Sequence, residues 1–238
     1  MRARSAILFG VTGSPYRLKA DPYSSHSVIL RHLPAGQGKK VLDVGAAGGY
    51  LAEILTGRGF EVTCVERDPG LAAAAAGKCR RVLVADLERE LPPLDGPFDV
   101  IVCGDILEHL SDPGRILAAL TPHLAADGRI IISVPNVAHL WVRLQLLRGR
   151  FDYADRGILD RTHVRFFTRQ SFLRLLAESK LAVVALIPTP VPLPLLVPER
   201  LHGAWLRGLH ALNALTARCW KSLFAYQFVA VARRGSAP

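Results

Sequence analysis

Cysteine is scarce in this chain of 238 residues, and the four cysteines follow no spacing typical of a metal site. They form no CxxC pair and have no histidine partner at zinc-finger spacing. Two of them lie inside apolar, strand-like runs, where a small thiol is ordinarily buried. We therefore expect reduced structural thiols at Cys64, Cys79, Cys103 and Cys219.

Acidic residues are also few. The chain has 20 Asp and Glu against 30 Lys and Arg, which gives a formal net charge of +10. This balance favours anionic partners. The basic residues are mostly arginines spread along the chain, so composition alone leaves nucleic acid open as a partner. With 50% hydrophobic residues the chain can bury a core, which excludes the disordered and fibrous classes.

A long unbroken hydrophobic run is missing as well. The longest apolar stretch, 181–197, contains four prolines, which would break a helix before it spanned a bilayer. At residues 1–20, glycine, proline and basic residues interrupt the apolar stretch before a signal-peptide core accumulates. We expect one domain over residues 1–238, located in the cytoplasm and without a transmembrane helix.

The chain does contain an alternation of short β-branched runs and longer Ala- and Leu-rich stretches, which is typical of βαβ units and a mostly parallel sheet. The runs predict strands at 40–44, 61–66, 81–85, 98–103, 129–134, 181–187 and 223–232. The other stretches predict helices at 49–56, 71–76, 113–120, 136–148, 168–178 and 199–220. Residues 149–167 lack a clean period, and we interpret them as an ordered functional loop.

The strongest local signal is the segment VLDVGAAGG, in which a strand ends in Asp43 and a loop of small residues opens directly into a helix. Such a loop lets the backbone approach a ligand, and the helix N-terminus offers unpaired N–H groups to an anion such as a carboxylate. The next strand ends in Glu66, at the position from which a carboxylate accepts hydrogen bonds from ribose hydroxyls. Together these features predict a nucleoside pocket.

Spacing decides between two classes of nucleotide-binding loop. A dinucleotide fingerprint needs glycines where this chain has Ala47 and Tyr50, which weakens a dehydrogenase interpretation. The segment instead resembles motif I of class I S-adenosylmethionine (SAM)-dependent methyltransferases, D-x-G-x-G-x-G, matched at Asp43, Gly45 and Gly49. The middle glycine is replaced by Ala47, whose added methyl group the motif tolerates if φ is negative there.

The resemblance covers roughly residues 20–232. Ala85-Asp86-Leu87, the segment FDVIVCGDILEHL and the strand end ISVPN resemble the ubiquinone-biosynthesis-like branch, and 156–168 resembles a segment of methyltransferases associated with bacterial cell-surface polysaccharides. The resemblance implies an α/β, Rossmann-like, seven-stranded and mostly parallel sheet with an antiparallel last strand and helices on both faces. It also implies an N-terminal helical cap at 1–39, a SAM-binding core at 40–135, a substrate-side helix and loop at 136–180, and C-terminal strands with an inserted helix at 181–238.

The resemblance further implies SAM as the cofactor. In this family the acid after the third strand, here Asp86, binds the adenine amino group, and the N-terminal helix, here with Tyr23 and His26, closes over the methionine end of SAM. The predicted cofactor-binding residues are Asp43, Gly45, Ala46, Ala47, Gly49, Tyr50, Glu66, Arg67, Asp86, Leu87, Gly104 and Asp105.

The candidate catalytic residues are His163, His139 and Asp105. A neutral imidazole can take a proton from a hydroxyl as the methyl group moves, and His163 lies in a polar loop suited to that task. The alternative is that His163 anchors the loop by bonding backbone. Asp105 ends the fourth strand, which faces the methyl donor in this fold.

Asp105, Glu108 and His109 form a cluster that some relatives use for a divalent cation. The same residues at this spacing also serve as a helix cap and first-turn charges. We expect no metal.

The predicted function is methyl transfer to an oxygen atom, because the fourth strand lacks the [D/N]-P-P-[F/Y] motif of methyltransferases that modify nucleic-acid amino groups. Family resemblance points to a sugar, a glycolipid or another small molecule, and the arginines at 143–174 suit an anionic one. An RNA methyltransferase and a non-catalytic SAM-binding partner protein are the alternatives. The helix at 199–220 is compatible with contact at a membrane surface. Nucleic acid is not the expected partner.

Overall fold

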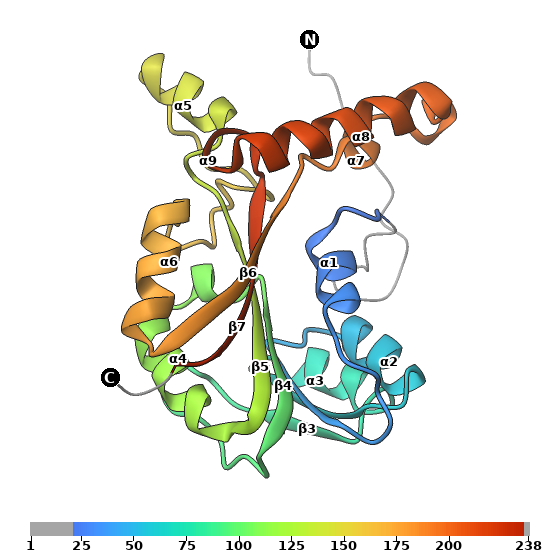
Figure 1. Ribbon diagram of the computed structural model, residues 1–238, viewed down its shortest axis with the longest axis vertical. Helices are drawn as coiled ribbons and strands as arrows, with labels where there is room; N and C mark the ends of the chain where they lie inside the picture. The colour runs from blue at the N-terminus through green and yellow to red at the C-terminus, as the bar shows by residue number, and fades with distance from the viewer. Residues whose placement is uncertain (1–20, 236–238) are drawn as a thin grey trace.

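The computed structural model describes residues 21–235 (Figure 1). The predictions for residues 1–20, including the interrupted signal-like stretch and half of the N-terminal cap, lie outside the described residues. The described residues form one seven-stranded sheet, in which the strand order is β3-β2-β1-β4-β5-β7-β6. The strands are β1 (Lys40–Val44), β2 (Glu61–Glu66), β3 (Arg81–Val84), β4 (Phe98–Gly104), β5 (Leu124–Pro135), β6 (Leu181–Thr189) and β7 (Gln227–Arg234).

Strands β1 to β5 are parallel to one another, and β7 runs antiparallel between β5 and β6. The predicted sheet, mostly parallel with an antiparallel last strand, is therefore confirmed. The order reverses beside β1, which has β2 on one side and β4 on the other, and an α/β sheet of this kind opens a crevice at the carboxyl ends of such strands.

Helices cover both faces of the sheet. Residues of β1 alternate between the two cores: Val41 packs with Val28, Ile29 and Leu55, whereas Leu42 lies in the core that contains Leu117 and Phe172 on the opposite face. This burial on both faces explains why the strands are almost continuously apolar. The α-helices are α1 (Ser25–Arg31), α2 (Tyr50–Gly57), α3 (Pro69–Ala75), α4 (Pro113–Leu120), α5 (Leu140–Leu147), α6 (Arg169–Glu178), α7 (Leu193–Leu196), α8 (Ala204–Cys219) and α9 (Lys221–Phe224), and the 3-10 helices are η1 (Leu107–His109), η2 (Thr121–His123) and η3 (Glu199–Leu201).

Several predicted boundaries were wrong. Strand β5 begins at Leu124, before the expected residue 129, and α9 occupies the start of the strand predicted at 223–232. Helix α5 begins at Leu140 and not at 136, because the Asn136 side chain donates to Ala225 O (2.8 Å) and accepts from Ala138 N (3.1 Å). Those side-chain bonds hold a turn where the apolar spacing indicated a helix.

Within residues 21–235, no helix is both long enough and apolar enough to cross a membrane. All four cysteines are unpaired, with Cys64 and Cys103 buried, Cys79 half-buried and Cys219 exposed. The exposure of Cys219 departs from the predicted structural role, because a structural thiol is a buried one.

Candidate functional site

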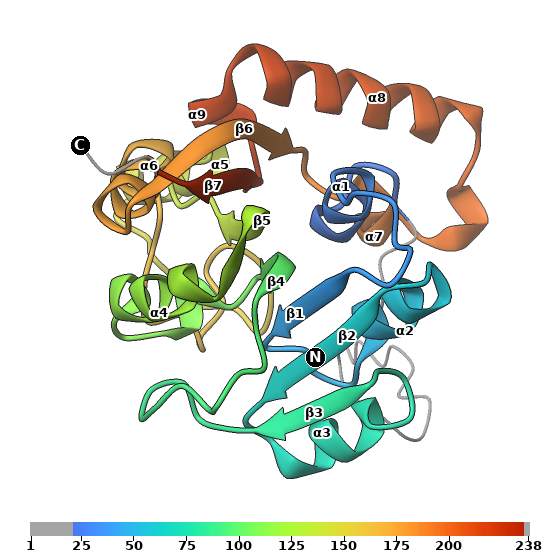
Figure 2. The same ribbon diagram turned by 60° about the horizontal axis from the view of Figure 1, so that its bottom comes forward.

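The site lies at the carboxyl ends of the central strands, where Asp43 of β1, Glu66 of β2 and Asp105 after β4 meet beside the loop at 45–49. In Figure 2 these strand ends lie between the helices of the two faces. The start of the loop stays bonded to β2, since Gly45 N (2.9 Å) and Ala46 N (3.1 Å) both donate to Val65 O. These bonds hold the motif I backbone at the carboxyl ends of β1 and β2.

Glycine is required at two positions of this loop. Gly45 has φ +76°, and a Cβ there would lie 2.8 Å from Ile106 Cδ1. Gly49, the N-cap of α2, has φ +73°, and a Cβ there would lie 2.9 Å from Ala75 Cα. Both positions therefore demand a left-handed residue without a side chain, which explains two of the motif's glycines.

The condition for tolerating Ala47, a negative φ, is not met, because its φ is +48°. Its backbone N–H donates to Glu66 Oε2 (2.8 Å), which fixes the loop in this turn. An alanine in the left-handed region costs about 1 kcal/mol relative to glycine. The middle motif position therefore keeps the conformation that glycine favours although glycine is absent.

Glu66 clamps the loop from the end of β2. Its two carboxylate oxygens accept from Ala47 N (2.8 Å) and Asp68 N (2.9 Å), and the residue is 8% exposed. Each oxygen has a second lone pair, so Glu66 can accept a hydrogen bond from a ligand hydroxyl while it keeps both bonds to the loop. The sequence predicted the ligand contact and missed the clamp.

Asp43 is the least satisfied polar group of the crevice. It is 4% exposed, and its Oδ2 has no hydrogen-bond partner among the described residues. Burial first, and then the nearby charge of Glu66, raise the pKa of Asp43 to about 7. A buried carboxyl oxygen without a donor fits a ligand that brings its own donors, as the hydroxyls and amines of SAM do.

Lys78 is a residue of the site that the sequence analysis missed. Its Nζ donates to Gly48 O (2.8 Å) and lies 4.6 Å from the centre of the Tyr50 ring, so a positive charge sits on the loop. Arg67 is exposed, Leu87 is buried, and Asp86 accepts from Glu88 N (3.1 Å). No sequence pattern marks Lys78, because it follows an Ala-rich helix at no fixed spacing from the motif.

Asp105 is a junction between four elements. It has φ +54°, its Oδ2 accepts from Ser25 Oγ of α1 (3.2 Å), and its Oδ1 accepts from Ser133 Oγ of β5 and from Gln227 Nε2 of β7 (3.1 Å). Asp105 N in turn donates to Ser133 Oγ (2.9 Å). The predicted site residue thus also joins α1 to the sheet, through three partners that the sequence analysis did not identify.

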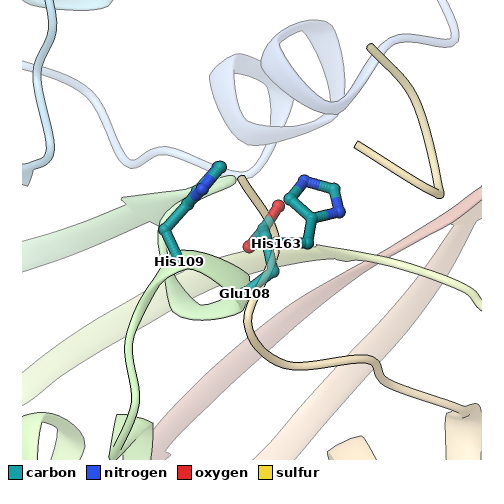
Figure 3. A group of neighbouring side chains, drawn as sticks. All are labelled: Glu108, His109 and His163. Atoms are coloured by element: carbon teal, nitrogen blue, oxygen red, sulfur yellow. The ribbon is translucent and has the colours of Figure 1, made fainter. Parts of the chain in front are cut away.

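Figure 3 shows a second cluster, in which Glu108 and His109 of η1 face His163 of the loop before α6. One ligand atom from each of the three residues lies within 4.8 Å of the others. His163 Nδ1 is 3.1 Å from Ile158 O and His109 Nδ1 is 3.2 Å from Thr162 O. Because a carbonyl only accepts, both Nδ1 atoms carry a hydrogen, and in the neutral form of each ring Nε2 keeps a lone pair.

The electrostatics of this cluster favour neutral groups. Glu108 is 1% exposed with Oε2 unpartnered among the described residues, and burial, followed by the charge of Asp105, raises its pKa. Burial also lowers the pKa of His163. A neutral imidazole with a free Nε2 can accept a proton, and the same three donors can hold a divalent transition ion. His163 thus anchors the loop through Nδ1, as the alternative interpretation has it, and its role as the base stays a prediction.

The structure places the remaining candidates outside this cluster. His139 is the N-cap of α5, where its Nδ1 accepts from Trp141 N (3.2 Å), and burial lowers its pKa. Tyr23 packs its ring 5.0 Å from that of His210 on α8, and His26 lies half-buried on α1. Among the described residues, Arg161 is the one arginine of 143–174 in an ion pair, with Asp155 (2.6 Å).

Comparison with known proteins agrees with this geometry. The family described as "Methyltransferase domain" matches residues 19–186. The ubiquinone biosynthesis O-methyltransferase of Xylella fastidiosa (strain 9a5c) is 36% identical over 117 residues, 45% of this chain and 46% of that protein. The enzyme of the same name from Psychrobacter arcticus is 34% identical over 160 residues, 58% of this chain and 62% of that protein. The chain spans about half the length of the curated relatives it matches.

Solved structures share the fold. The TehB-like SAM-dependent methyltransferase from Corynebacterium glutamicum superposes with a TM-score of 0.56 at 19% identity, over 90% of this chain and 89% of that one. Magnesium protoporphyrin IX methyltransferase from Synechocystis PCC 6803, solved with bound SAH, gives 0.56 at 17% identity, over 87% of this chain and 78% of that one.

Proposed function

Because the chain belongs to the class I SAM-dependent methyltransferases, we propose that it transfers the methyl group of SAM to a hydroxyl oxygen of a sugar, a glycolipid or another small molecule. The unpartnered buried Oδ2 of Asp43 beside the motif I loop carries the cofactor part of this proposal. SAM, when bound, supplies an electrophilic methyl group, so the protein needs no nucleophile of its own. Its task is to align the acceptor oxygen with that methyl group.

The cofactor-binding residues are those at the carboxyl ends of the strands. Glu66 keeps the loop at 45–49 closed and offers its remaining lone pairs to the ribose hydroxyls. The N-terminus of α2 directs free N–H groups toward the carboxylate of the cofactor, and Lys78 adds a positive charge on the same loop. Asp86 is assigned to the adenine end by its place after β3.

The acceptor side is assigned to His163. Its Nδ1–H is anchored on Ile158 O, which leaves Nε2 to take the hydroxyl proton as the methyl group arrives. An oxygen acceptor is supported by the names of the curated relatives, which are O-methyltransferases. The sugar or glycolipid is supported by the resemblance of residues 156–168. Arg156 and Arg165 of the same stretch form no ion pair with any described residue, and they suit an acceptor with phosphate or carboxylate groups.

Calorimetric titration with SAM and with S-adenosylhomocysteine tests the cofactor pocket. We expect micromolar binding that Asp43→Ala and Glu66→Ala abolish and that Asp127→Ala preserves, because Asp127 is exposed at the opposite edge of the sheet. Turnover is then measured with hydroxylated glycans and glycolipids. His163→Gln is expected to bind SAM normally and to lose turnover by ~100-fold or more.

Each other outcome removes part of the proposal. Binding of NAD in place of SAM would favour the dehydrogenase interpretation of the loop. SAM binding without turnover on any hydroxyl acceptor would favour the non-catalytic partner protein. Methylation of RNA with salt-sensitive binding would favour the RNA methyltransferase.

A further inference from the structure

Four helices gather at one end of the molecule. Helix α5 follows the carboxyl end of β5, and α7 and α8 follow the carboxyl end of β6, which runs in the same direction. Figure 1 shows α5, α7, α8 and α9 together at this end. They therefore lie at the edge of the sheet that carries the candidate site.

Helix α8 is apolar on two opposite sides. Its inner side buries Leu206, His210, Ala214 and Ala217. Its outer side carries large apolar residues at helical spacing that stay exposed to solvent: Trp205 (56%), Leu209 (47%), Leu212 (56%) and Leu215 (54%). A helix with apolar residues all round ordinarily has a partner on both sides, and residues 21–235 supply a partner on only one.

Helix α5 repeats the pattern at the same end. Trp141 (51%), Leu144 (40%) and Leu147 (83%) are exposed along it, and Trp220, just past α8, is 68% exposed. We call these residues, together with the outer residues of α8, the α5–α8 face. All three tryptophans of the chain belong to it. Tryptophan is the side chain most enriched where an apolar surface meets lipid headgroups.

Neither α5 nor α8 carries an acidic residue. No Asp or Glu occurs between Asp127 and Asp152, and none follows Glu199. The basic residues of these two stretches that lie on or next to the helices of this end are Arg143, Arg148, Arg150, Arg200, Arg207, Arg218 and Lys221. On α8, Arg207 and Arg218 are exposed and lie on one side of the helix, next to the apolar strip. The face is thus apolar along its strip and basic beside it.

We propose that the α5–α8 face docks on the surface of an anionic phospholipid bilayer. Exposed Trp and Leu enter the headgroup region while the flanking arginines neutralise lipid phosphates, as in amphipathic helices that lie in a membrane surface. A second copy of the chain fits poorly, because two such faces would bring like charges together. RNA would use the arginines and leave the leucines in water.

Docking on a membrane would also restrict which molecules can be the methyl acceptor, and this step rests on the proposed function. The face and the candidate site share one edge of the sheet, so a docked enzyme would hold its crevice beside the headgroups. That arrangement selects an acceptor hydroxyl on a membrane-anchored glycolipid over one on a free sugar. The binding proposal itself needs no assumption about the reaction.

Vesicle binding followed by tryptophan fluorescence tests the proposal, since every tryptophan is a reporter on this face. We expect the emission to shift to the blue with vesicles of phosphatidylcholine and phosphatidylglycerol, to shift little with phosphatidylcholine alone, and to revert in high salt. Flotation with the same vesicles should recover the protein. The doubly substituted variant Leu209→Glu/Leu212→Glu is expected to bind these vesicles at least about tenfold more weakly than the unaltered chain.

The matched control is Val84→Glu/Val184→Glu, which adds the same charge at exposed valines of β3 and β6 (59% and 61%) and should bind as the unaltered chain does. SAM titration of each variant shows that it is folded. Anionic vesicles that leave the emission unchanged in a SAM-binding protein would overturn the proposal. So would equal weakening in both double variants, or a shift produced by RNA and not by vesicles. Loss of SAM binding in the unaltered chain would instead count against the proposed function.

Discussion

The folded protein disfavours the ionised form of the Asp43 carboxyl group. Burial and Glu66 raise its pKa from 3.8 to about 7, so the folded chain retains a proton that the unfolded chain releases at lower pH. The folded state is therefore the stronger proton binder between these values, and stability declines as pH rises from about 4 to about 7. The carboxyl group that we assign to the cofactor therefore lowers the stability of the protein above about pH 4.

Asp43→Asn should remove this penalty. At about pH 8 we expect the variant to unfold at higher denaturant concentration than the unaltered protein, by up to ~3 kcal/mol, because a neutral amide replaces a buried charge of similar shape. Near pH 4 the two proteins should be equally stable, and SAM binding should be lost throughout. Equal stability at both pH values would show that Asp43 is ionised without cost.

Ala47→Gly should stabilise the protein by about 0.5–1 kcal/mol in urea unfolding. The left-handed φ of +48° strains alanine and suits glycine, although glycine adds entropy to the unfolded chain. Ala46→Gly is the control, since Ala46 is buried beside it without a positive φ and the change should destabilise. Loss of stability in both variants would contradict the assignment of strain.

Sequence predicted the residues whose role is local. Asp43, Gly45 and Gly49 follow from the spacing of a strand, a tight loop and a helix. Ser25 and Gln227 could not be found this way, because they reach Asp105 across 80 and 122 residues of chain, and only the packed sheet brings them there. Ala47 shows the limit of a motif: the residue type argued for one φ, and the Glu66 bond to its N–H imposed the other.

At the scale of elements, the loop before α6 is docked on η1 by its backbone. Val164 N (2.9 Å) and Arg165 N (3.0 Å) both donate to Glu108 O, which presents His163 to His109. The sequence marked this stretch as a functional loop because it lacked a period. It could not show that the loop is rigid, since the bonds that fix it involve backbone atoms.

The pH dependence of turnover should report His163. Burial lowers its pKa from 6.5, so the base form persists into mildly acidic solution and the acidic limb of kcat/KM should have its midpoint below 6.5. His163→Gln should remove that limb together with ~100-fold or more of the rate, whereas His123→Gln, a matched change on η2 before β5, should leave both unaltered. An unchanged limb in the His163 variant would reassign the base.

Metal ions should inhibit the enzyme and not activate it. The imidazole route needs no ion, so we expect EDTA to leave the rate unchanged. Zn²⁺ should inhibit by occupying the Nε2 lone pairs of His109 and His163 together with Glu108. Glu108→Gln should weaken this inhibition about tenfold, because the amide is a poorer ligand than a carboxylate. A loss of activity in EDTA that Zn²⁺ restores would make the cluster a catalytic metal site.

At the scale of the whole molecule, the sheet could be predicted because each βαβ unit repeats the same alternation. The placement of α8 could not, since it depends on a contact between residues 189 positions apart: His210 Nε2 lies 3.0 Å from Asp21 Oδ1, with both residues buried. Tyr23 packs its ring against the same histidine. This contact ties the C-terminal helix to the segment that leads into α1, which Ser25 in turn joins to Asp105.

His210→Ala should therefore act far from its own position. It removes the imidazole from the buried Asp21 carboxyl, whose Oδ1 keeps the N–H of Tyr23 (2.9 Å), so we expect a cost of about 1–3 kcal/mol of stability, and it frees α8 from the segment before α1. Hydrogen exchange should become faster in both α8 and α1, and SAM affinity should fall although His210 reaches the predicted pocket only through its contacts with Asp21 and Tyr23. His202→Ala is the control, because His202 is exposed and bonds only Val197 O nearby in the chain (2.9 Å). Faster exchange confined to α8, with α1 unchanged, would show that the two helices move independently. An unchanged SAM affinity would show that α8 does not affect the cofactor site.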